Sequence, residues 1–182
     1  MSLAAETHHE DHYGKVTAPR TLEMQRLLPG PLERVWDYLT KSDLRAQWLA
    51  SGDMPMKAGA ECELVWHHDT ITNPLGTKPD TMGAESKLPS RVTVYEPPHK
   101  LGFMFWSDSE VIFELKPAGK RVLLTLTHRA LPSRGMMVGV STGWHSHLDV
   151  LAKLLAGEKP EYFWDHWRAY KDAYEARIPQ DV

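Results

Sequence analysis

Residues 137–155, MVGVSTGWHSHLDVLAKLL, decide the fold. Their large side chains recur at intervals of three and four, which places them along one side of a single long helix. Gly157 ends this predicted helix. Gly139 and Gly143 lie four residues apart on it, and their smooth strip predicts a close approach to another backbone or a bend. The helical stripe consists of Met137, Val140, Trp144, His147, Leu148, Leu151 and Leu155.

Short segments with strand-like alternation precede this helix. Pro97-Pro98, Ser107-Asp108 and Pro117-Ala118-Gly119 are turn sequences that separate the last four of them, and such short connections predict an antiparallel meander. Asn73–Pro89 is rich in Gly, Pro, Thr and Lys, which predicts a long loop or a mobile hairpin tip. The predicted strands are Glu61–His68, Arg91–Glu96, Leu101–Trp106, Glu110–Lys116 and Arg121–His128.

The chain before these strands predicts a further strand and two short helices. Arg20–Leu28 alternates as a strand does, and Pro29-Gly30-Pro31 stops it. Pro31–Thr40 has apolar residues at helical spacing, and Ser42 can cap a second helix that carries Leu44, Trp48 and Leu49.

Composition limits the class of protein. The 182 residues are 42% hydrophobic and 25% charged with a formal charge of −3, which fits one globular domain or one domain with an appendage. No basic stripe points to nucleic acid, and no apolar run is long enough to span a membrane. Cys62 is the only cysteine, and no basic, apolar leader precedes the domain, so we expect a cytoplasmic protein.

Both ends of the chain predict appendages. Residues 1–19 are polar and His-rich, so we expect a flexible leader, and we place the main domain at residues 20–157. Pro160 opens a last helix that extends to Arg177, within an extension at residues 158–182. Its aromatic face is the candidate surface for binding another protein or for forming a homodimer. That face consists of Phe163, Trp167, Tyr170 and Tyr174.

Several motifs in this order carry a family resemblance. They are Pro29–Trp36, Val94–Pro98, Leu101–Phe105, Leu124–His128, Leu131-Pro132 and Gly143-Trp144.

Together these motifs resemble the START-related and birch-pollen-allergen-like (SRPBCC) superfamily, and within it the branch named for activators of the ATPase of the ninety-kilodalton heat-shock chaperone. The resemblance covers roughly residues 21–157 and implies an α+β helix-grip fold, in which a curved antiparallel sheet wraps the long helix. The segment 73–89 and the last helix depart from the family's pattern.

A bent sheet and a helix do not pack flush everywhere, so we expect a cavity between them for a small apolar or aromatic molecule. Strand parity and the helical stripe select residues that face this space. Aromatic rings would supply stacking surface, and the polar members would orient polar groups of the ligand. The predicted binding residues are Arg26, Trp66, Phe103, Phe105, His128, Trp144 and His147.

The polar members carry alternatives. Arg26 lies on the apolar face of its strand, so it either pairs with an interior acid or a ligand carboxylate, or its strand is an edge and the side chain reaches outward. His128 and His147 are either satisfied core residues or groups that orient a ligand or move a proton. His145 is spaced four residues before Asp149, as in a surface pair.

Metal and nucleophilic chemistry have little support. Neighbouring histidines in a strand face opposite ways, and His145 and His147 lie about 200° apart on a helix, so no pair chelates an ion locally. A composite site of His68, His128 and His147 is conceivable, but we predict no metal and no other cofactor. Cys62 has no neighbouring motif and fits a small inert residue.

Three functions therefore remain. The first is a binding protein for a small hydrophobic or aromatic molecule. The second is an enzyme of the cyclase or hydratase kind, with His128 or His147 as the acid–base group. No other catalytic residue is predicted. The third, by analogy with chaperone co-activators, is a protein-interaction module that uses the aromatic face of the last helix. Fold alone does not decide between them.

Overall fold

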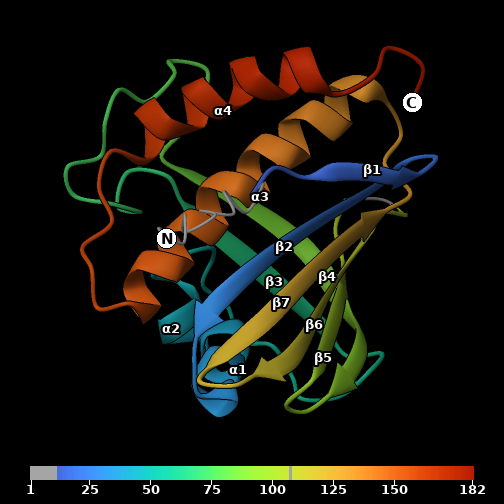
Figure 1. Ribbon diagram of the computed structural model, residues 1–182, viewed down its shortest axis with the longest axis vertical. Coiled ribbons are helices and arrows are strands. Elements are labelled where there is room, and N and C mark those ends of the chain that lie inside the picture. The colour runs from blue at the N-terminus through green and yellow to red at the C-terminus, as the bar shows by residue number, and fades with distance from the viewer. Residues whose placement is uncertain (1–11, 107) are drawn as a thin grey trace, which may run out of the picture.

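The computed structural model describes residues 12–106 and 108–182, which form an α+β fold with one curved antiparallel sheet (Figure 1). Within these residues the sheet has seven strands in the order β1-β2-β7-β6-β5-β4-β3. The strands are β1 (Lys15–Ala18), β2 (Thr21–Pro29), β3 (Glu61–His67), β4 (Glu85–Glu96), β5 (Lys100–Met104), β6 (Glu110–Ala118) and β7 (Arg121–Arg129).

The helices are α1 (Leu32–Thr40), α2 (Ser42–Arg45), α3 (Arg134–Leu155) and α4 (Phe163–Arg177). α3 crosses the concave face of the sheet, and α4 lies along α3 on the side away from the sheet (Figure 1). This arrangement confirms the predicted helix-grip fold and the antiparallel meander, because β3 to β7 pair consecutively.

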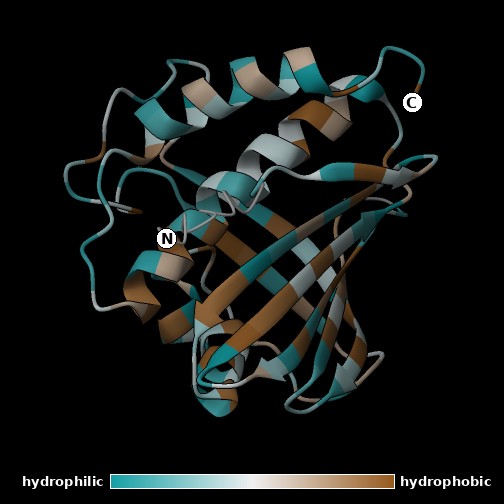
Figure 2. Cartoon of the chain, viewed as in Figure 1, coloured by the Kyte–Doolittle hydropathy of each residue, from teal (hydrophilic) through white to brown (hydrophobic). Residues whose placement is uncertain are grey.

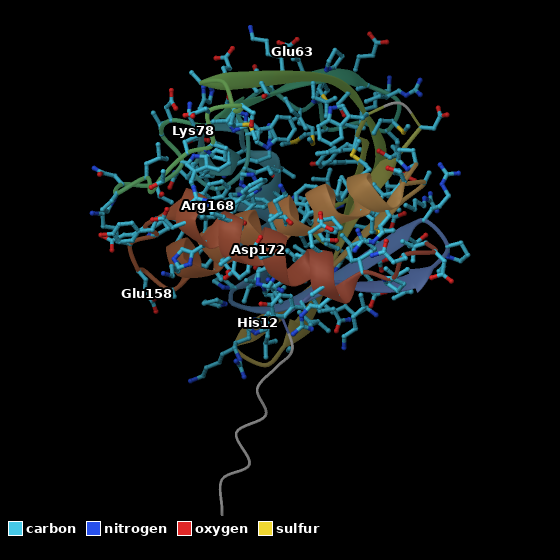
Figure 3. All side chains as sticks on the ribbon, turned by 90° about the horizontal axis from the view of Figure 1, so that it is seen from above. His12, Glu63, Lys78, Glu158, Arg168 and Asp172 are labelled. Atoms are coloured by element: carbon cyan, nitrogen blue, oxygen red, sulfur yellow. The ribbon has the colours of Figure 1, made fainter. Side chains whose placement is uncertain are left out.

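The core follows from the alternation that the sequence shows. Leu22, Met24 and Leu28 of β2 are buried and pair with inward residues of β7. In α3, Leu148 and Leu151 are fully buried beneath the helix. Figure 2 shows strands that alternate between hydrophobic and hydrophilic residues, and an α4 that is largely hydrophilic. Labelled charged side chains such as Glu63 point outward from the sheet (Figure 3).

The long predicted loop is shorter than expected. Glu85–Pro89 belongs to β4 and pairs with β3, from Glu63 opposite Pro89 to His67 opposite Glu85. Pro89 and the nearby Gly83 are typical of loops and hide an alternation in which Leu88, Ser90 and Val92 are buried.

The predicted leader is also partly structured. Residues 1–11 lie outside the described part of the chain, but Lys15–Ala18 forms β1 on the free edge of β2. Its burial pattern is mostly exposed, so hydrophobic alternation gives no sign of it. Backbone pairing to β2 is what holds this strand.

α3 begins three residues earlier than predicted, where the Ser133 side chain accepts a hydrogen bond from the backbone N–H of Met136 at 3.2 Å. Of the two alternatives predicted for the α3 glycines, close approach to another backbone is wrong. A Cβ at Gly139 or Gly143 would have no atom within 4 Å outside the helix's own backbone. The glycines therefore face open space, which belongs to a pocket.

Candidate functional site

An aromatic pocket of about 320 Å³ lies between α3 and the β3–β5 part of the sheet, and α4 forms a further wall. This volume is at the low end of small-molecule sites, which span about 300–1,000 Å³. Indole and phenyl rings from four separate parts of the chain line it. They include Trp66, Phe105, Trp106, Trp144, Trp164 and Trp167.

The rings hold each other in place edge to face. The centroids of Trp66 and Phe105 are 5.8 Å apart at 85°, and those of Phe105 and Trp144 are 5.6 Å apart at 48°. Edge-to-face and tilted contacts of this kind fix the orientation of the rings. Of the predicted binding residues, the structure brings Trp66, Phe105, Trp144 and His147 together here.

Gly139 and Gly143 provide the smooth side of the pocket. Glycine in a helix interior costs roughly 0.5–1 kcal/mol relative to alanine, and no steric contact requires it at these positions. Helix packing therefore does not explain the two glycines, and what they provide is open space in the pocket.

His147 is the polar group of the predicted set that lines the aromatic pocket. Its Nδ1 lies 2.6 Å from the backbone oxygen of Trp48, and a carbonyl only accepts, so Nδ1 carries the proton. Burial lowers the pKa of His147 to about 4, although the bond to Trp48 opposes that shift. The neutral ring therefore has an unprotonated Nε2, an acceptor for a ligand O–H or N–H.

His68 is a second histidine of the pocket wall. Its Nε2 lies 2.8 Å from Ser86 Oγ, and burial, followed by the charge of Lys78, lowers the pKa of its ring. The backbone oxygen of His68 accepts a hydrogen bond of 3.0 Å from the indole N–H of Trp164. His68 thus connects the end of β3 to α4.

α4 and residues 69–84 form one closing unit over the pocket. The backbone N–H of Thr77 donates to Asp165 Oδ1 at 2.9 Å, and Arg168 donates to the Thr77 oxygen at 2.7 Å. Figure 3 shows Arg168 on α4 and Lys78 on the neighbouring segment. This unit contributes Met82 and Trp164 to the lining.

His128 does not face the aromatic pocket. It is fully buried, its Nδ1 accepts a hydrogen bond of 3.0 Å from the indole N–H of Trp144, and its Nε2 lies 3.3 Å from Ser109 Oγ. Burial lowers its pKa to about 3, so the ring is neutral and donates from Nε2. Nδ1 thus orients Trp144 and Nε2 is engaged by Ser109, so neither nitrogen is left for a ligand.

Phe103 is a core residue as well. Its side chain is 1% exposed and stacks on Phe113 with centroids 6.1 Å apart, and it lines neither the aromatic pocket nor the other pocket beneath α4. Strand parity places Phe103 and Phe105 on the same face, but it does not distinguish the filled part of the concavity from the hollow part.

Arg26 lies in a different place, a polar pocket of about 240 Å³ between β2, α3 and α4. β2 is an inner strand and the Arg26 side chain is 2% exposed, so the outward-reaching alternative for Arg26 is wrong. The guanidinium pairs instead with the half-buried Asp149 of α3, at 3.3 Å from its Oδ1.

The pair of His145 and Asp149 exists, but the prediction that it lies on the surface is wrong. His145 is 3% exposed, its Nε2 is 3.8 Å from Asp149 Oδ2, and its ring stacks on Tyr170 at 3.8 Å. Burial lowers the pKa of His145 to about 4, although Asp149 opposes the shift. α4 covers this part of α3, which helical spacing alone does not show.

The aromatic face of α4 is turned inward. Phe163 and Tyr174 are 4% and 0% exposed, and Trp167 and Tyr170 are half-buried, so the predicted exposed patch does not exist. Two pocket residues were not among those predicted. Trp164 is buried beside Phe163, and Trp106 is half exposed at the β5–β6 turn. The Phe163-Trp164 pair at the start of the predicted helix was the available signal for Trp164.

The described residues form neither a metal-binding cluster nor an activated thiol. Within residues 12–106 and 108–182 no three histidine, cysteine or acidic side chains come together as metal ligands. Cys62 is half-buried, and burial raises the pKa of its thiol. In the same residues no helix has the length and apolarity that crossing a bilayer requires.

Comparison with known proteins adds three solved structures of similar fold. A protein from Bordetella parapertussis, solved by solution NMR, is 38% identical with a TM-score of 0.78, over 92% of this chain and 91% of that chain. CalU16 from Micromonospora echinospora is 20% identical with a TM-score of 0.61, over 86% of each chain. A protein from Rhodobacter sphaeroides is 22% identical with a TM-score of 0.61, over 79% of this chain and 97% of that one.

Residues 29–156 match the family described as Activator of Hsp90 ATPase homolog 1-like protein. No protein with a curated description matches the chain. The family match ends before α4, so the helix that closes the aromatic pocket lies beyond it.

Proposed function

The chain belongs to the Activator of Hsp90 ATPase homolog 1-like family, as the sequence motifs predict, and from this premise we propose that it binds a small, planar aromatic molecule in the aromatic pocket. The observation that carries the proposal is the pair of α3 glycines that face open space opposite a wall of indole rings. A ring system that enters this space gains stacking contacts without displacing a side chain.

The polar groups of the pocket narrow the class of ligand. His147 is neutral near pH 7 and offers Nε2 as an acceptor, which favours a ligand with a phenolic or enolic O–H. Lys87, exposed at the rim, is ion-paired with Glu85. The interior therefore suits an uncharged aromatic ring with a hydroxyl group rather than a carboxylate.

A pair of matched compounds tests this proposal. We expect 2-naphthol to bind in isothermal titration calorimetry, and 2-methoxynaphthalene, which keeps the rings but lacks the O–H, to bind about five- to tenfold more weakly. Gly143→Leu fills the pocket and should abolish binding of both, whereas Gly135→Leu, at an exposed position in the first turn of α3, should leave it unchanged. Equal binding to wild type and Gly143→Leu would refute the proposal.

An enzymatic role of the cyclase or hydratase kind is a second candidate, now confined to one histidine. The unprotonated Nε2 of His147 favours it as a proton acceptor, while His128 has both nitrogens engaged. His147→Gln should then abolish turnover of a hydroxyl-bearing aromatic substrate and change its affinity little. Unchanged turnover in His147→Gln would exclude this role.

A further inference from the structure

The aromatic pocket has a second polar position, on its sheet side, that the proposed function does not use. Ser86 of β4 lies directly opposite Trp66 of β3, and both residues line the pocket. Strand parity places Ser86 on the same face of β4 as Leu88 and Ser90, which are buried, whereas Ser86 is exposed. A side chain on the concave face that is nevertheless exposed borders the open part of the pocket, where a bound molecule reaches it.

His68 holds the Ser86 hydroxyl from just beyond the end of β3. Its Nε2 lies 2.8 Å from Ser86 Oγ, and both residues belong to the pocket wall. The indole N–H of Trp164 donates to the backbone oxygen of His68, and the rings of Trp164 and His68 lie 5.8 Å apart, so α4 fixes this histidine. Burial and the charge of Lys78 lower the pKa of His68, so its ring is neutral at pH 7.

The Ser86 hydroxyl keeps an acceptor position in either tautomer of His68. A serine hydroxyl donates one hydrogen bond and accepts two. If His68 Nε2 is the acceptor, Ser86 Oγ retains both of its acceptor positions. If His68 Nε2 carries the proton and donates it, Ser86 Oγ retains one acceptor position and its own proton. A ligand O–H therefore meets an acceptor at Ser86 in both cases.

Ser86 and His147 offer acceptors from opposite walls of the same space, one from the sheet and one from α3. Aromatic rings connect the two positions along α4. The ring of His147 lies 4.9 Å from that of Phe163. Phe163 in turn lies 5.0 Å from Trp164, which contacts His68 at 5.8 Å. A planar molecule with a single O–H meets one of these acceptors and leaves the other to water.

We propose that the aromatic pocket selects an aromatic diol, in which one O–H donates to His147 Nε2 and a second O–H, at the other end of the ring system, donates to Ser86 Oγ. This inference rests on the proposed function, because Ser86 adds a contact to a ring system already held between α3 and the indole wall. Ser86 is then a specificity-determining residue of the pocket.

The experiment compares 2-naphthol with 1,5-, 2,6- and 2,7-dihydroxynaphthalene in isothermal titration calorimetry of the full chain. At least one of the diols should bind about five- to tenfold more tightly than 2-naphthol, because it adds one hydrogen bond to the same rings. Each diol has two equivalent O–H groups, which by themselves raise its affinity by about twofold, so the expected gain exceeds this statistical factor.

Two serine variants locate the second contact. Ser86→Ala should bring the diol to within about twofold of 2-naphthol and leave the affinity for 2-naphthol unchanged. Ser86 is exposed, so we expect this variant to fold. Ser51→Ala is the matched control, because Ser51 Oγ lies 2.9 Å from His67 Nε2 and neither residue lines the aromatic pocket. It removes a serine–histidine bond of the same kind and should change neither affinity.

Binding of 2-naphthol separates the two possible failures. If 2-naphthol binds and no diol binds more than about twofold more tightly, the second acceptor is not used and this inference is wrong, while the proposed function stands. A gain that persists in Ser86→Ala, or that is lost equally in Ser51→Ala, also overturns it. If neither 2-naphthol nor any diol binds, the proposed function fails and the inference fails with it.

Discussion

The aromatic pocket and the polar pocket lie on either side of Phe163, beneath the same helix α4, and they differ in the groups that line them beside their apolar residues. The first is lined by indole rings and neutral histidines, and its open side is a strip of two glycines. The second contains an ion pair between the buried Arg26 and the half-buried Asp149, which connects β2, α3 and, through Tyr170, α4. The two pockets therefore differ in role. The ion pair stabilises the packing of β2, α3 and α4, whereas Gly139 and Gly143 leave the space of the aromatic pocket unfilled.

The largest expected effect is loss of stability in acid. His128, His145 and His147 have pKa values lowered by burial to about 3, about 4 and about 4, against 6.5 in the unfolded chain. The unfolded state therefore binds more protons below pH 6.5. Each histidine contributes stability that is complete above pH 6.5 and falls by about 1.4 kcal/mol per pH unit as the pH drops toward its folded pKa.

Urea unfolding at several pH values checks this dependence, and His145→Asn should remove about a third of the slope between pH 6 and pH 4. A free energy of unfolding that stays flat over this range would show that the three rings are not buried in neutral form.

Removal of the acid from the ion pair should have the next largest effect. Asp149→Ala leaves Arg26 charged, buried and without its carboxylate, so the free energy of unfolding should fall by about 3 kcal/mol. Asp172→Ala, on the exposed side of α4 (Figure 3), is the matched control and should change it little. Similar losses for the two variants would mean that Asp149 is not the connection between β2 and the helices.

Filling the aromatic pocket should affect binding and spare stability. Gly139→Leu adds a side chain where nothing lies within 4 Å of the Cβ, so affinity for 2-naphthol should fall at least tenfold while the chain stays at least as stable as before. Calorimetry and urea unfolding on the same sample measure both. A large loss of stability would indicate that the strip packs against something after all.

The smallest effect is a gain. Gly139→Ala should raise the free energy of unfolding by about 0.5–1 kcal/mol, since alanine restricts the unfolded chain and meets no atom in the folded one. Gly102→Ala is the opposite case, because its Cβ would lie 2.7 Å from Thr93 Oγ1 in the sheet. A gain at Gly102, or a loss at Gly139, would contradict this account of the two positions.

The sequence predicted the parts of the fold that depend on periodicity. The stripe from Met137 to Leu155 gave α3, and alternation in residues 20–28 gave β2 with Arg26 facing inward. Periodicity did not reveal β1, which depends on backbone pairing, or the start of β4, where Pro89 and Gly83 resemble loop residues.

The sequence predicted which side chains point into the concave face of the sheet, but not which of them border the pocket. The aromatic pocket brings together Trp66, Phe105, Trp144 and His147. Phe103 and His128 also point inward, but they lie in the packed core. Whether a concave sheet is filled or hollow at a given strand position depends on the neighbours across it, which one sequence does not specify. The contribution of α4 depends on where the chain returns after Gly157.

A crystal structure of the chain with 2-naphthol is the strongest test of ligand binding in the aromatic pocket. We expect the naphthalene ring between the Gly139–Gly143 strip and Trp66, with its oxygen within hydrogen-bond distance of His147 Nε2. A structure in which the indole rings fill that space themselves, or in which the compound lies elsewhere while the pocket stays empty, would contradict it.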